Sequence, residues 1–160
     1  MNIREATKAD FAGIWPIFQE IVTAANSYTY PPDTTEEEAF DIWLTRPHKT
    51  FVMEEDGVII GTYYIKQNQP GPGSHVCNCG YMVASQARGH GIATAMCLHS
   101  QETAVTLGYK AMQFNLVVST NVTAVKLWQK LGFNIVGQIP QAFSHPTLGF
   151  VDAFVMYKWL

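Results

Sequence analysis

Apolar residues recur along the chain in two kinds of pattern, which together predict a sequence of strands and helices. Short runs of apolar and β-branched residues, separated by turn residues such as Asp56-Gly57, predict strands at 2–6, 50–54, 58–66, 76–84, 111–118, 133–138 and 151–159. Apolar residues spaced by three and four positions predict helices that begin after Thr7, begin after Thr34 or Thr35, and span 91–107 and 121–131.

The order of these elements indicates the fold class. Reading from the N-terminus, it is strand-helix-helix-strand-strand-strand-helix-strand-helix-strand-strand, which predicts a mixed α/β or α+β layer fold. Neither a repeat nor a linker interrupts the order, so residues 1–160 are expected to form a single domain. A chain of this length can bury a core without a disulfide or a metal.

Composition and charge exclude several classes of protein. No apolar run reaches the ~18 residues of a membrane span, and the N-terminus lacks the apolar core of a secretory signal. The net charge of −3, without a basic stripe, argues against a nucleic-acid partner. Three cysteines cannot pair completely, which favours a reducing, cytoplasmic location. Cys77-x-Cys79 is tighter than usual zinc-ligand spacing, so no metal is expected.

A glycine-rich turn between the strand at 76–84 and the helix at 91–107 is the most informative motif. It contains Gln86-Ala87-Arg88-Gly89-His90-Gly91. Free N–H groups at a helix N-terminus bind phosphate, and Arg88 adds a positive charge beside them. A Walker A loop is absent, and a dinucleotide fingerprint would need a glycine or alanine in place of Thr94. The net positive charge of residues 57–151 also suits an anionic ligand such as a phosphorylated cofactor.

The motif Gln86-x-x-Gly89-x-Gly91 resembles the pyrophosphate loop of the Gcn5-related N-acetyltransferases (GNAT). A second family motif is matched by Asn121, Ala124 and Trp128 at the expected separation. The resemblance implies a GNAT-like central mixed, mostly antiparallel sheet of about seven strands flanked by about four helices, with acetyl-CoA as cosubstrate and no metal. It also implies that the cofactor contacts Met82, Val83, Arg88, Gly89, His90, Gly91, Ile92, Ala93, Thr94 and Asn121.

The chain departs from the family where many members carry their acid and base. Trp128 stands in place of the tyrosine that protonates the leaving thiolate, and indole cannot serve as an acid near neutral pH. Trp128 is therefore expected either as a wall of the substrate pocket or as part of the core. The strand at 76–83 has no carboxylate in place of the family's glutamate base, and His145 is only a distant candidate for a base.

Asparagines in two strands are the candidates for orienting the substrate. Alternation along 111–118 places Asn115 and Val117 on one face and Phe114 on the other. Because Asn115 lies in an apolar run, it is expected to be buried, with its amide bonded to neighbouring backbone or to a substrate. Asn78, Asn115 and Asn121, with Trp128, resemble a subgroup known from yeast that acetylates azetidine-2-carboxylate, a proline analogue. That resemblance implies that Asn78 and Asn115 have catalytic roles at the substrate.

The sequence predicts direct acetyl transfer, in a ternary complex, to a small-molecule amine or imino acid. Backbone N–H groups near Met82 and Val83 would bind the acetyl oxygen. By analogy with the family layout, Tyr28 and Tyr30 complete the acceptor pocket, although they could also only pack the break after the first helix. A covalent route through Cys77 or Cys79 is disfavoured, because no histidine flanks them.

The sequence is compatible with two other functions. They are a degenerate acyl-CoA-binding or regulatory module, and an acetyltransferase for a peptide or protein N-terminus. No membrane partner is expected, and only the family resemblance suggests a homodimer.

Overall fold

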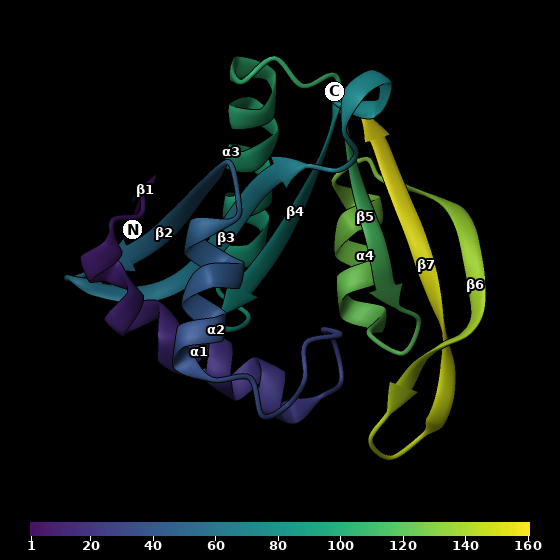
Figure 1. The fold of residues 1–160 in the computed structure, drawn as a ribbon, viewed down its shortest axis with the longest axis horizontal. Helices are drawn as coiled ribbons and strands as arrows, with labels where there is room; N and C mark the ends of the chain where they lie inside the picture. Colours follow the sequence, from purple (N-terminus) through teal and green to yellow (C-terminus); the bar gives the residue numbers. More distant parts are fainter.

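The centre of the protein is a seven-stranded sheet with the strand order β1-β2-β3-β4-β5-β7-β6 (Figure 1). The structure is a computed structural model that describes residues 1–160. The strands are β1 (Asn2–Glu5), β2 (Lys49–Glu55), β3 (Val58–Gln67), β4 (Val76–Val83), β5 (Ala111–Val118), β6 (Asn134–His145) and β7 (Gly149–Trp159). All neighbours are antiparallel except β4 and β5, which are parallel.

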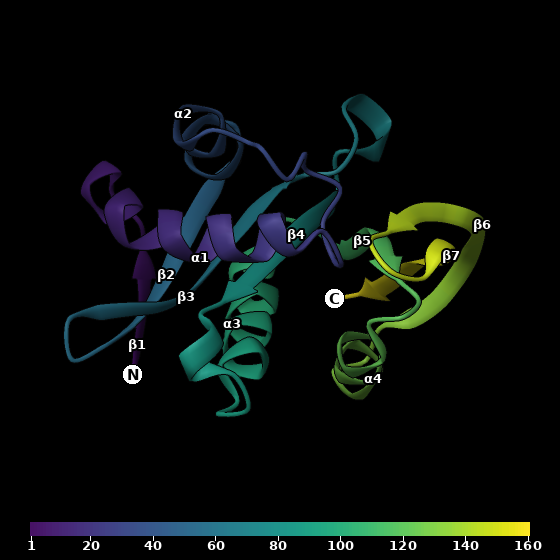
Figure 2. The same cartoon turned by 90° about the horizontal axis from the view of Figure 1, so that it is seen from below.

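Helices cover both faces of this sheet. They are α1 (Phe11–Ala24), α2 (Glu36–Phe40), α3 (Ile92–Thr106) and α4 (Val122–Lys130). The first two lie over one face and the last two over the other (Figure 2). The predicted mixed fold, with a mostly antiparallel sheet of seven strands and four helices, is confirmed. None of these helices has the length and apolar character needed to cross a membrane.

Two elements differ from the sequence prediction. The helix α2 is short and continues as a wider π-helical turn, Asp41–Thr45, which brings Trp43 into the core. The strand β6 runs to His145, well beyond the predicted end at residue 138. Most side chains of the edge strand β6 are exposed, so its apolar pattern does not mark where the strand ends.

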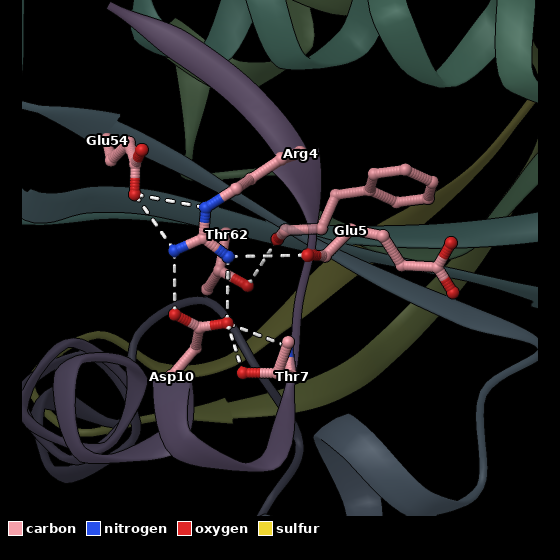
Figure 3. A network of polar contacts seen from close by, with 7 residues as sticks. Arg4, Glu5, Thr7, Asp10, Glu54 and Thr62 are labelled. Atoms are coloured by element: carbon pink, nitrogen blue, oxygen red, sulfur yellow. Dashed lines mark hydrogen bonds and ion pairs between the residues drawn. The ribbon is translucent and has the colours of Figure 1, made fainter.

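A polar cluster around Arg4 fixes the start of α1 against the sheet (Figure 3). Both terminal nitrogens of its guanidinium donate to Asp10, at 2.9 and 2.8 Å, and Nε and one terminal nitrogen donate to Glu54. Asp10 also accepts from the backbone N–H of Thr7 at 2.7 Å, which forms a capping box at the predicted helix start. The Arg4 guanidinium holds the pKa of Asp10 well below its usual range. The cluster thereby ties β1, β2 and the entry of α1 together.

The sheet opens between β4 and β5. Their parallel pairing is limited to Val76 with Ala111 and Cys77 with Met112, although each strand has eight residues. Beyond these pairs the strands separate toward their carboxyl ends, as Figure 1 shows. The opening, called the fork below, leaves one side of β4 without a neighbouring strand.

Candidate active site

A cleft of about 910 Å³ occupies the fork and extends over the α1 side of the sheet. It is lined by residues of α1, the loop that follows it, β3, β4, β5 and the start of α4. The predicted site residues that line it are Tyr28, Tyr30, Asn78, Val83, Arg88, Asn115, Asn121 and Trp128. The fold therefore brings together side chains that the sequence places up to a hundred positions apart.

The glycine-rich turn adjoins this cleft through Arg88. Gly89 and Gly91 adopt φ values of 80° and 77°, and a Cβ added at either would meet nothing within 4 Å. No side chain caps α3 at Gly91, and the first backbone bond of the helix is donated by Ala95. The backbone N–H groups from Gly89 to Thr94 thus have no partner within the protein. The segment is an open cradle of donors at a helix N-terminus, which fits a diphosphate.

Side chains add little charge to this cradle. The guanidinium of Arg88 lies 3.4 Å from the carboxylate of Glu20, and both side chains are exposed. The residues His90, Ile92, Ala93 and Thr94 do not line the cleft itself. Their predicted contribution therefore rests on their backbone N–H groups and on the dipole of α3.

The backbone of β4 presents alternate residues to the fork. Ala84 donates its N–H to Ile60 of β3, whereas the carbonyl of Tyr81 faces the fork and accepts from the hydroxyl of Tyr28 at 2.7 Å. Since the direction of backbone groups alternates along a strand, Val83 presents its N–H to the fork and Met82 presents its own to β3. The side chain of Met82 is also buried in the core. The prediction of Met82 as a donor to the acetyl oxygen is therefore corrected, because its N–H is directed at β3, whereas the same prediction for Val83 remains compatible with the geometry.

Asn78 lies at the point where β4 and β5 separate. It is 6% exposed, and both ends of its amide are bonded within the protein. Its Nδ2 donates to the backbone carbonyl of Gln113 on β5 at 2.9 Å, and its Oδ1 accepts from the hydroxyl of Tyr64 on β3 at 3.0 Å. This side chain follows the last paired residues of the two strands and bridges them where the backbone ladder stops.

Asn115 differs from its prediction. It is exposed, because β5 has left β4 at this point and this face of the strand borders the cleft. Its amide forms hydrogen bonds with side chains only. Nδ2 donates to the side-chain oxygen of Asn68 at 2.7 Å, and Oδ1 accepts from the side-chain nitrogen of Gln113 at 3.0 Å. A bulge between Phe114 and Val117 also shifts the alternation by one residue, so the predicted faces hold only up to the bulge.

Aromatic side chains form the walls of the cleft. The rings of Tyr28 and Tyr30 stack at 5.6 Å, and Tyr28 also packs against buried Trp43. Burial raises the pKa of both tyrosines, so their hydroxyls stay protonated. Tyr28 and Tyr30 thus pack the break after α1 and line the cleft, and the two predicted alternatives are compatible.

The start and middle of α4 form the opposite wall. Trp128 lies 5.1 Å from the rings of both Tyr81 and Phe114, so it packs on the core and also faces the cleft. Asn121 caps α4, with its Oδ1 accepting from the N–H of Ala124 at 3.3 Å.

Sequence reasoning missed Tyr64, Lys66 and the carboxylate of Glu20, which also line the cleft. The strand β3 was predicted, but its register against β4 is set across a loop rich in glycine and proline and could not be read from the pattern. The structure also brings His145 into the lining. Its Nδ1 accepts from the backbone N–H groups of Thr147 and Leu148, so the ring shapes the β6–β7 turn.

The sequence and the structure were compared with known proteins. Residues 15–133 match the sequence profile of the acetyltransferase (GNAT) family. A solved Gcn5-related N-acetyltransferase from Kribbella flavida is 44% identical, with a TM-score of 0.94 over 99% of this chain and 97% of that one. The yncA protein of Salmonella typhimurium, solved with its cofactor acetyl-CoA, is 23% identical, with a TM-score of 0.88 over 100% of this chain and 94% of that one.

A curated relative is also similar in sequence. N-acetyltransferase aca1 of Schizosaccharomyces pombe is 37% identical over 100 residues, which are 61% of this chain. The match covers 47% of that protein, so this chain corresponds to about half of its length.

Proposed function

Since the chain belongs to the acetyltransferase (GNAT) family, we propose that it transfers an acetyl group from acetyl-CoA to the amine of a small molecule, directly and in a ternary complex. The observation that carries this proposal is the fork, with its unpaired side of β4, next to the open cradle of N–H groups at Gly89–Thr94. The cradle fits the diphosphate of acetyl-CoA. The fork leads from the cradle toward Asn78 and Asn115, the side chains proposed to contact the acceptor.

The reaction joins the acceptor nitrogen to the acetyl group. The neutral amine attacks the thioester carbon of acetyl-CoA, the carbon–sulfur bond breaks with its electron pair on sulfur, and the proton lost by the amine balances the thiolate. The N–H of Val83, which faces the fork, is placed to stabilise negative charge developing on the carbonyl oxygen. Orienting two reactants in one cleft can lower the barrier by ~7–11 kcal/mol, so positioning supplies much of the catalysis.

The cleft offers no unpaired carboxylate as a base. Glu20 is its only carboxylate and is paired with Arg88, while Asn78 and Asn115 cannot take a proton. His145 also lines the cleft, but its Nδ1 already accepts from the backbone of the β6–β7 turn. The amine therefore enters neutral or loses its proton through water. The Tyr28 hydroxyl is protonated and donates to the carbonyl of Tyr81 in the fork, so it could donate to the leaving group, in place of the acid that Trp128 cannot supply, only after it releases that carbonyl.

The acceptor that best fits the asparagines is an imino acid of the proline-analogue class, such as azetidine-2-carboxylate. Asn115 is exposed in the cleft and can turn from its partner Asn68 toward a ligand. Asn78 lies beside it at the base of the fork.

The test is acetyl-CoA-dependent thiol release with a panel of amines. The panel contains azetidine-2-carboxylate, other proline analogues, primary amino acids, polyamines and a peptide with a free N-terminus, each corrected for the three thiols of the protein. Turnover confined to cyclic imino acids is expected. Turnover on another amine would retain acetyl transfer and discard the imino-acid acceptor.

A binding module without catalysis is the second candidate. The absence of a free carboxylate in the cleft and the tryptophan at position 128 favour it. Acetyl-CoA binding, measured by calorimetry, without turnover on any amine of the panel would select this candidate.

A further inference from the structure

We propose that Lys66 binds a carboxylate of the acceptor, so that the protein acetylates small amines that carry an acid group. The inference rests on the proposed acetyl transfer and names the chemical class of the acceptor. Lys66 ends the cleft-facing part of β3 and is paired in register with Asn78, the residue at the base of the fork.

Among the charged residues that line the cleft, Lys66 is the one without an ion-pair partner. The charged residues that line the cleft are Glu20, Lys66 and Arg88, and the first and last form an ion pair at 3.4 Å. The ammonium of Lys66 forms neither an ion pair nor a hydrogen bond with any residue of the protein. Its ammonium lies 5.2 Å from the centre of the Tyr64 ring, which holds the side chain over the cleft-facing surface of β3.

The surroundings of this ammonium favour an anion. Partial burial and the positive charge of Arg46 lower the pKa of Lys66, and no carboxylate opposes them. A half-buried cation without a counter-charge is costly, and a carboxylate placed against it recovers that cost. The free protein offers no such group here, which leaves the ligand to supply it.

The same charge selects against other amines. A polyamine would bring further positive charges toward Lys66 and be repelled. A peptide N-terminus carries an amide where an amino acid carries its α-carboxylate, so it would leave Lys66 unpaired. An amino or imino acid instead places its carboxylate on the lysine. The ammonium of Lys66 also disfavours the protonated form of the acceptor amine, which helps explain how the cleft can work without a strong base.

The experiment compares azetidine-2-carboxylate with azetidine-2-carboxamide, in which an uncharged amide replaces the carboxylate. Because the two ring amines differ in basicity, kcat/KM is expressed per neutral amine. Wild-type protein is expected to prefer the acid in kcat/KM by on the order of 10- to 100-fold, the range of one charge-assisted hydrogen bond. Lys66→Gln should remove this preference through a loss on the acid alone. Lys66→Arg should retain most of it, because the charge is kept. Lys110→Gln, which removes an exposed lysine outside the cleft, should behave like the wild type.

Binding of the same two compounds to the protein with CoA, measured by calorimetry, separates the carboxylate site from acetyl transfer. If neither compound is acetylated but the acid binds more tightly and Lys66→Gln abolishes that difference, acetyl transfer to these acceptors fails and the carboxylate site stands. If transfer occurs but Lys66→Gln lowers both acceptors equally, or the wild type prefers the amide, the role of Lys66 is overturned.

Discussion

The two sides of the cleft present different chemical groups, backbone N–H groups on one side and side chains on the other. The proposed cofactor side consists of backbone N–H groups at Gly89–Thr94 and on the open side of β4. The proposed acceptor side consists of side chains, with Asn78, Asn115 and Lys66 presented by three neighbouring strands. In this proposal, backbone groups would recognise the cofactor whatever side chains they carry, provided that the turn keeps its shape. The acceptor would be recognised by side-chain identity, so this side could change specificity while the fold and the cofactor side persist.

The largest effect is expected from Asn78→Leu. It leaves the Tyr64 hydroxyl and the Gln113 carbonyl without their partner, at a cost of roughly 1–3 kcal/mol for each unpaired group. Turnover should fall by about 100-fold or more, because the two strands that position the reactants lose their bridge. Initial rates and thermal unfolding measure the two effects. Asn134→Leu, at an exposed position of β6, should change neither; unchanged turnover in Asn78→Leu would contradict the bridging role.

On the cofactor side, the strongest effect is expected from Gly91→Ala. A Cβ at φ 77° costs roughly 1–2 kcal/mol and shifts the N–H groups of the cradle. The Kd of acetyl-CoA should rise about 10-fold, equivalent to ~1.4 kcal/mol, while the ranking of acceptors stays the same.

Gly57→Ala is the matched control for this change. Gly57 has the same φ of 77° and open space around it, but it lies in the β2–β3 turn outside the cleft. Its variant should lose similar stability and keep its affinity for acetyl-CoA. Equal affinity losses in the two variants would mean that the cradle does not hold the cofactor.

A smaller effect is expected from Asn115→Ala, which tests the acceptor side alone. The side chain is exposed and bonded only to other side chains, so the fold should tolerate its loss. Turnover should fall about 5-fold, equivalent to ~1 kcal/mol and typical of one hydrogen bond between uncharged groups, with acetyl-CoA affinity unchanged. Asn2→Ala on β1 serves as the control. Turnover equal to the wild type would remove Asn115 from the acceptor site.

The difference between the two sides also explains what the sequence could reveal. The glycine turn is a local motif, so its place between a strand and a helix could be predicted from the sequence, and the family resemblance adds a cofactor role for Gly89 and Gly91. The order of strands and helices followed from periodicity. The exposure of Asn115 could not be predicted, because it depends on the fork and on a bulge in β5 that the apolar run does not mark. The position of Lys66 beside Asn78 could not be predicted either, because it depends on the register of two strands joined by a long loop.

The smallest effect is expected from Cys79→Ala, at the boundary between the two sides. Cys79 lines the cleft, and a covalent route would need its thiolate. Burial raises the pKa of this thiol, and no histidine is bonded to it, so direct transfer predicts turnover within about 2-fold of the wild type. Cys97→Ala on α3 removes an equally buried thiol outside the cleft and controls for lost packing. Mass spectrometry of the protein incubated with acetyl-CoA alone should show no acetylated cysteine. Complete loss of turnover in Cys79→Ala, with Cys97→Ala active, would instead establish an acyl-cysteine route and make the two sides of the cleft act in sequence.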